Sequence, residues 1–142
     1  MNASHAAEVT WKGVAVSCAL ANAVLHTLLI PDHLEEMFYV GLLFAVGSAL
    51  MLVVAAALVV RERPLAAWLS GVLISLGMIV GFVLSRTVGL PGGYYEPGWE
   101  APYGPLCLLA EGLFVVAFLA WFTYTTAEAP EPHRAARLST RQ

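Results

Sequence analysis

The sequence consists of four long apolar stretches separated by short polar segments. A helix needs about 20 residues to cross the hydrocarbon core of a bilayer, and each stretch approaches or exceeds that length. The pattern therefore predicts an all-α fold, a four-helix transmembrane bundle within residues 1–126, followed by a polar cytoplasmic tail over residues 127–142. The expected membrane spans cover about residues 13–30, 37–60, 65–84 and 105–124.

The first stretch also allows a second interpretation, as a signal peptide. Ala21-Asn22-Ala23 resembles a cleavage site for the removal of such a peptide. The positive region that should precede it would consist of Lys12 alone, so a membrane span is the preferred interpretation.

The composition agrees with a membrane protein. The chain is 59% hydrophobic and 12% charged, whereas a soluble domain carries about 25% charged residues. Its formal charge is −3 and its seven Lys and Arg residues are dispersed, which excludes a basic face for nucleic acid. The sequence has no Gly-rich phosphate loop, nucleophile elbow or CxxC motif. These absences favour a non-catalytic protein.

The distribution of basic residues predicts the orientation in the cell membrane. Lys and Arg concentrate in cytoplasmic loops of membrane proteins. We therefore expect both termini in the cytoplasm and the segments 31–36 and 86–104 outside. The aromatic residues of the second segment fit an interfacial belt: Tyr94, Tyr95, Trp99 and Tyr103. The basic residues on the expected cytoplasmic side are Lys12, Arg61, Arg63, Arg134, Arg137 and Arg141.

The turn between the first two spans contains helix-ending and helix-starting signals. Pro31 is expected to end the first helix, because proline lacks a backbone N–H. Asp32 is expected to cap the second helix, with Glu35 completing a capping box. Capping alone would explain the acids of this turn.

A polar stripe runs along the first span. Cys18, Asn22 and His26 recur every four residues and so lie on one helical face. Glu111 is the acid within the fourth span and lies at a similar depth to His26. An ionisable residue inside a membrane needs a polar partner. We expect His26 as the first partner of Glu111 and Arg86 as the second.

The same region contains candidate metal ligands. His26, His33, Glu36 and Glu111 combine imidazole with carboxylate, a set that suits a transition metal. Glu96 and Glu100 from the other outer segment are further candidates. A proton relay or a purely structural polar network is the alternative, with Cys18, Asn22, Asp32 and Arg86 as members.

Small residues in the third span predict a packing face. Gly77, Gly81 and Ser85 recur every four residues, a pattern that lets two membrane helices approach closely. The second span offers Gly41 and Gly47 for the same purpose. The neighbour of the third span is either another helix of this chain or a partner protein.

Two motifs resemble a group of small four-span membrane proteins of actinobacteria. One runs from Leu25 to Glu36 with the letters LHTLLIPDHLEE, and the other from Leu84 to Gly92 with the letters LSRTVGLPG. Glu96, Glu100 and Glu111 follow the second motif. The resemblance covers about residues 10–126 and implies the four-span architecture, but it supplies no chemistry.

These observations predict a membrane accessory subunit. Its small size, its glycine patterns and the lack of a catalytic motif favour docking onto a larger membrane complex, such as a metal-dependent oxidase or monooxygenase. A stand-alone metal- or proton-handling protein that uses the outward-facing His and Glu residues is one alternative. An oligomeric channel or transporter is another. The expected partners are the lipid bilayer and other membrane subunits or further copies of the chain, without nucleic acid.

Overall fold

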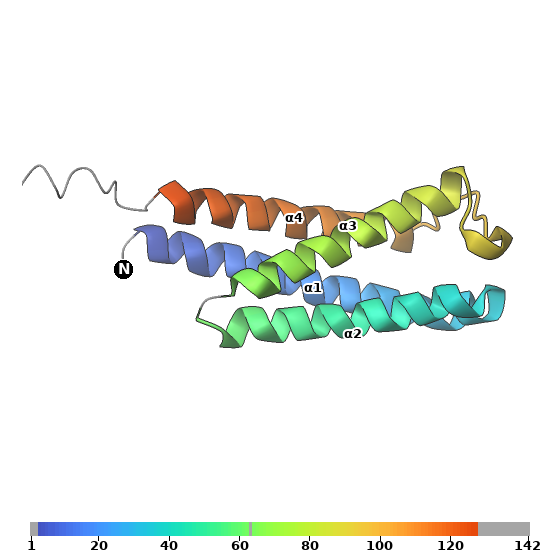
Figure 1. Ribbon diagram of the computed structural model, residues 1–142, viewed down its shortest axis with the longest axis horizontal. Helices are drawn as coiled ribbons and strands as arrows, with labels where there is room; N and C mark the ends of the chain where they lie inside the picture. The colour runs from blue at the N-terminus through green and yellow to red at the C-terminus, as the bar shows by residue number, and fades with distance from the viewer. Residues whose placement is uncertain (1–2, 63, 128–142) are drawn as a thin grey trace, which may run out of the picture.

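Four long α-helices lie side by side in one elongated bundle (Figure 1). The computed structural model describes residues 3–62 and 64–127. A single-turn 3-10 helix, η1 (Pro91–Gly93), interrupts the connection between α3 and α4. The described residues contain no β-strand beyond one isolated bridge, so the all-α prediction is confirmed. The long helices are α1 (Ala3–Glu36), α2 (Phe38–Val60), α3 (Leu65–Thr87) and α4 (Tyr103–Ala127).

All four long helices are long and apolar enough to cross a membrane, which makes the chain a multi-pass membrane protein. The α2–α3 connection lies at the same end of the bundle as the start of α1, and the α3–α4 connection lies at the other end (Figure 1). Arg63 and the tail from residue 128 onward, including Arg134, Arg137 and Arg141, lie outside the described residues.

The first turn differs from the prediction. α1 continues through Pro31 to Glu36, and Met37 rather than Asp32 precedes α2. Met37 is extended and makes no side-chain capping bond, while its N–H donates to the carbonyl of His33 at 2.9 Å. Proline costs α1 one backbone hydrogen bond, but this helix packs along α2 and α4 for most of its length, and tertiary packing overrides local signals. The predicted capping role of Asp32 is therefore wrong.

A hydrophobic core fills the half of the bundle next to the α2–α3 connection. Trp68 stacks on Trp121 at 5.2 Å between ring centroids and packs against Phe114 at 5.7 Å. Ala15 and Ala19 of α1 are completely buried and let the neighbouring helices approach. Cys18 belongs to this core rather than to a polar network, because its buried neighbours are apolar.

The structure shows which of the glycines pack against another helix of this chain. A Cβ atom added at Gly77 or Gly81 would meet nothing within 4 Å, so these positions of α3 do not form a close contact with another helix of the chain. Gly71 does form a close contact with another helix, because a Cβ atom added there would collide with the Phe114 ring of α4. Gly41 and Gly47 of α2 lie against Leu34 and Met78, as the sequence predicted for close packing.

The contrast between two glycines of α3 can be tested by alanine substitution. We expect Gly71→Ala to lower the free energy of unfolding by about 1–3 kcal/mol, because the added methyl overpacks against Phe114. Gly77→Ala should raise it by about 0.5–1 kcal/mol, because alanine is the better helix former and the site has space. Thermal unfolding in detergent measures both, and equal effects of the two substitutions would contradict this packing.

Candidate functional site

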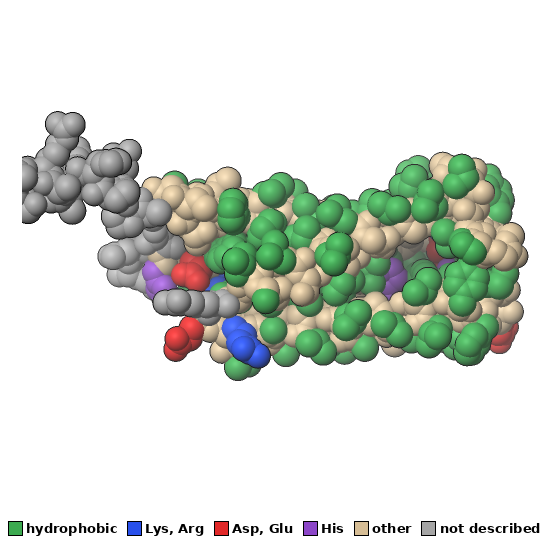
Figure 2. Space-filling view, in the orientation of Figure 1, with side chains coloured by type: hydrophobic (Ala, Val, Ile, Leu, Met, Phe, Trp, Pro, Cys, Tyr) green, Lys and Arg blue, Asp and Glu red, His purple; other side chains and the backbone are tan. Residues whose placement is uncertain are grey.

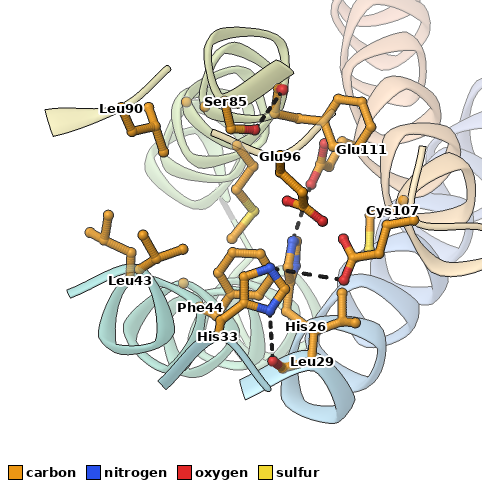
Figure 3. Close-up of a pocket in the computed structure, with 18 of the residues that line it drawn as sticks. His26, Leu29, His33, Leu43, Phe44, Ser85, Leu90, Glu96, Cys107 and Glu111 are labelled. Atoms are coloured by element: carbon orange, nitrogen blue, oxygen red, sulfur yellow. Dashed lines mark hydrogen bonds and ion pairs between the residues drawn. The ribbon is translucent and has the colours of Figure 1, made fainter. Parts of the chain in front are cut away.

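The half of the bundle next to the α3–α4 connection encloses a cavity of about 300 Å³. Its polar lining comes from α1, α4, the last turn of α3 and the α3–α4 connection, and its apolar lining comes mainly from α2 and the rest of α3. Histidine and acidic side chains are visible at the base of a hollow between α2 and α3 (Figure 2). Figure 3 shows the lining residues, whose polar groups form an inner and an outer cluster. The cavity is therefore both polar at one end and open between two helices.

The inner cluster consists of Asn22, His26 and Glu111. The amide Nδ2 of Asn22 donates to Oε1 of Glu111 at 3.1 Å, and Nδ1 of His26 lies 2.8 Å from Oδ1 of Asn22. Nε2 of His26 faces Oε1 of Glu111 at 3.7 Å. All three residues are buried, with at most 6% of their surface exposed. This triad joins α1 to α4, and it bears out His26 as the partner expected for Glu111.

The contacts of the inner triad determine where one hydrogen lies. The Asn22 oxygen can only accept, so Nδ1 of His26 carries the hydrogen between them. Nε2 of a neutral His26 then presents a lone pair to the Glu111 carboxyl group. The contact between Nε2 of His26 and Oε1 of Glu111 therefore lacks a hydrogen. Either protonation of one of the two groups or a bound hydrogen-bond donor can supply it.

The outer cluster surrounds His33. Nδ1 of His33 lies 2.8 Å from the Leu29 carbonyl, which only accepts, so Nδ1 carries the hydrogen and Nε2 is free to act as a ligand. The ring stacks on Phe44 at 4.3 Å, which holds its orientation. Its Nε2 faces Oε1 of Glu100 at 3.9 Å, and one ligand atom from each of His33, Glu96 and Glu100 lies within 4.8 Å of the other two.

Arg86 anchors the α3–α4 connection above this cluster. Its guanidinium donates to the Gly98 carbonyl at 2.7 Å and to the Ser85 hydroxyl at 2.7 Å. It also pairs with Glu96 at 3.2 Å and Glu100 at 3.3 Å, and it lies over the Phe82 ring at 3.6 Å from the centroid. Arg86 is thus occupied by the outer acids, and the expectation that it could serve Glu111 is wrong.

Tyr94 connects one further acid, Glu36, to the outer cluster. Its hydroxyl lies 3.0 Å from Glu96 and 3.3 Å from Glu36, and its single hydrogen can be donated to either carboxylate. Burial and the neighbouring Glu96 raise the pKa of Tyr94 above its ordinary value, so the phenol stays protonated and remains a donor. Tyr94 is only 8% exposed, so it does not belong to an interfacial aromatic belt.

The acids of the outer cluster repel one another. Burial, followed by the nearby Glu96, raises the pKa of Glu100, while His33 and Arg86 act in the opposite direction. The carboxylates of Glu96 and Glu100 share the single guanidinium of Arg86, and the Glu36 carboxylate lies beside them across the Tyr94 hydroxyl. The cluster therefore carries surplus negative charge that a cation would neutralise.

The four residues predicted as one metal site divide between two clusters. His26 and Glu111 belong to the inner triad, whereas His33 faces Glu96 and Glu100. Glu36 joins the outer cluster only through Tyr94. The remaining predicted members have other surroundings: Asp32 is exposed, and Gly77, Gly81 and Ser85 line the cavity.

The sequence did not indicate Tyr94 and Phe44 as site residues. Both belong to aromatic-containing segments in which no spacing distinguishes a buried residue from a lipid-facing one. No known protein family, curated protein or solved structure matches this chain.

The inner triad predicts that Asn22 is important for stability. Asn22→Leu keeps the size of the side chain but leaves both His26 and Glu111 without their hydrogen-bond partner. We expect the free energy of unfolding to fall by about 1–2 kcal/mol, the range for interhelical hydrogen bonds in membranes and for buried groups left unpaired. Thermal unfolding in detergent measures the change.

Ser75→Ala is the matched control for this prediction. Ser75 is also completely buried, but its hydroxyl has no hydrogen-bond partner among the described residues. Its removal should change the free energy of unfolding by less than about 0.5 kcal/mol. Similar effects of Asn22→Leu and Ser75→Ala would show that the triad contributes no specific stability.

Proposed function

We propose that this protein is an integral protein of the cell membrane that binds a divalent transition-metal ion at its outward-facing end. The ligands are His33 of α1 and Glu96 and Glu100 of the α3–α4 connection. The positive-inside rule supports the orientation, because Lys12 and Arg61 belong to the opposite end of the bundle. Both termini would then be cytoplasmic.

The orientation of His33 is the observation that supports this proposal most. A buried imidazole whose Nδ1–H donates to a backbone carbonyl is the usual arrangement of a metal-binding histidine. Here Leu29 provides that carbonyl, and the opposite nitrogen faces two carboxylates at a separation too long for a hydrogen bond. Two ligands of one tetrahedral zinc ion lie about 3.4 Å apart, so small side-chain shifts would complete the site.

The chemistry of the ligands limits the choice of ion. One imidazole and two carboxylates suit Zn²⁺, Mn²⁺ or Fe²⁺, whereas thiolate-rich sites suit Cu(I). Cys107 lines the same cavity but is not a member of the ligand group. Three protein ligands leave at least one coordination position for water or substrate. The proposed ion also balances the surplus carboxylate charge that Arg86 leaves uncompensated.

Docking onto a larger membrane complex is a second candidate function. It draws support from α3, of whose most apolar segment only 22% is buried, compared with 33–39% for the other three helices. Its open glycines, Gly77 and Gly81, offer a surface on which a helix of a partner protein could pack closely. A metal-dependent oxidase or monooxygenase would be a partner consistent with a metal-binding subunit.

Metal binding can be measured by titrating the purified protein in detergent with Zn²⁺. We expect saturable binding of about one ion per chain, weakened at least tenfold by His33→Ala and by Glu96→Gln, because each removes one ligand. Glu35→Gln is the matched control, since Glu35 is exposed and makes no contact with the cluster. Absent binding, or binding unaffected by both ligand substitutions, would refute the proposed site.

The same titration should depend on pH. Because burial and Glu96 raise the pKa of Glu100, this carboxyl group takes up a proton at a higher pH than an exposed glutamate does. The metal must displace that proton, so Zn²⁺ affinity should fall as the pH is lowered from about 7.5 to about 5. In the metal-free protein the free energy of unfolding should instead rise as the pH is lowered through this range, because protonation of Glu100 favours the folded state.

The docking function predicts a stable partner. Purification from membranes in a mild detergent should recover the chain together with another membrane protein at a fixed ratio. Gly77→Leu and Gly81→Leu should release that partner, because their side chains would fill the open face of α3. Recovery of the chain alone, or as a homo-oligomer, would exclude an accessory subunit.

A further inference from the structure

We propose that the cavity between α2 and α3 binds an amphiphile that has an ammonium head and an alkyl chain. The head lies between His26 and Glu111, and the chain follows the apolar lining toward the opening between the two helices. This site uses the inner triad and does not depend on the proposed metal site at His33.

The missing hydrogen of the inner triad indicates what kind of head fits. Nε2 of His26 and Oε1 of Glu111 are both acceptors in the arrangement with neutral His26 and ionised Glu111, and they face each other at 3.7 Å. Asn22 donates one amide hydrogen to Glu111 and accepts the Nδ1 hydrogen of His26, and its second amide hydrogen makes no bond to Nε2 of His26. A ligand that donates hydrogen bonds would satisfy both atoms at once.

The surrounding charges favour a cationic donor. Glu96 and Glu100 line the same cavity, and the guanidinium of Arg86 is already shared between them. An ammonium group has three donors and a positive charge, so it complements these acceptors. A carboxylate head would add a further negative charge and would be repelled.

The apolar end of the cavity suits an alkyl chain. Gly77 and Gly81 of α3 leave open space where any other residue would place a side chain. Leu43 of α2 and Ile74 and Met78 of α3 provide apolar walls. The hollow between α2 and α3 lies along the side of the bundle (Figure 2), where hydrocarbon chains surround a membrane protein. A chain-bearing ligand can therefore enter from the bilayer without crossing water.

The size of the cavity is consistent with such a ligand. A volume of about 300 Å³ lies at the lower limit for small-molecule sites. Phe44 meets the His26 ring edge-on at 4.8 Å and stacks on His33, so it forms an aromatic wall beside the proposed head position.

The test uses three probes that share a twelve-carbon chain: dodecylamine, dodecanol and dodecanoic acid. The full-length protein is placed in nanodiscs of phosphatidylcholine, and its thermal midpoint is followed as each probe is added. We expect a saturable increase with dodecylamine, half-maximal at a concentration at least tenfold lower than for the other two probes. Equal effects of all three, or no saturable increase with dodecylamine, would overturn the proposal.

Two substitutions test the head and chain positions separately. Glu111→Gln should abolish the preference for dodecylamine over dodecanol, because it removes the charge that the ammonium meets. Gly77→Leu should weaken dodecylamine binding at least tenfold by filling the cavity. If Glu111→Gln does not fold, Gly77→Leu alone still tests whether the cavity binds dodecylamine. This variant should fold, because the leucine side chain has space at position 77.

Matched controls distinguish this site from the metal site. Gly112→Leu makes the same change at another open helical glycine that does not line the cavity, and it should leave dodecylamine binding unaltered. Glu111→Gln should leave Zn²⁺ binding within about threefold of the wild-type value, because Glu111 is not a ligand of the outer cluster. Unchanged dodecylamine binding in both Glu111→Gln and Gly77→Leu would refute the proposal even if Zn²⁺ binds as expected.

Discussion

The polar contact between α1 and α4 is the constraint on which the rest of the structure depends. Glu111 is buried in a helix that crosses the membrane, where lipid offers no hydrogen-bond partner. Asn22 and His26 supply that partner from α1, which fixes the facing sides of both helices. Because His33 lies two turns beyond His26, the same rotation directs it toward the same cavity.

Arg86 fixes the end of the bundle next to the α3–α4 connection, as the inner triad fixes α1 against α4. Its contacts with Ser85, Gly98, Glu96 and Glu100 hold the α3–α4 connection over the cavity and bring two acids to His33. These pairs are partly buried, so solvent screens them less than it would screen an exposed ion pair. One guanidinium nevertheless faces more than one carboxylate, and the surplus charge is what makes the cluster a candidate cation site.

Sequence patterns predicted the helices and the inner pair, and they named His33, Glu96 and Glu100 as candidate ligands without separating them from His26 and Glu111. Long apolar stretches define membrane helices because lipid tolerates little else, and the matched depth of His26 and Glu111 follows from helical rise. The predicted helix end at Pro31 and the predicted helix cap at Asp32 were wrong, because the packing of a long helix outweighs these local turn signals. The spacing of Gly77 and Gly81 did not decide between a helix of this chain and a partner protein, because small residues permit a close approach without specifying a neighbour. The approach of Glu96 and Glu100 to His33 depends on Arg86 and Tyr94, which no periodicity reveals.

The proposed metal ion and the proposed ammonium ligand would reach the same cavity by different routes, the first from water and the second from the bilayer. His33, Glu96 and Glu100 belong to the end of the bundle next to the α3–α4 connection, where a hydrated ion arrives from water, whereas His26 and Glu111 line the cavity between α2 and α3. Each bound cation would reduce the negative potential that attracts the other, since the clusters share the low-dielectric interior. Linkage then requires that a metal ion weakens ammonium binding by the same factor by which the ammonium weakens metal binding. A lipid-borne ligand would thereby regulate metal occupancy without touching a metal ligand.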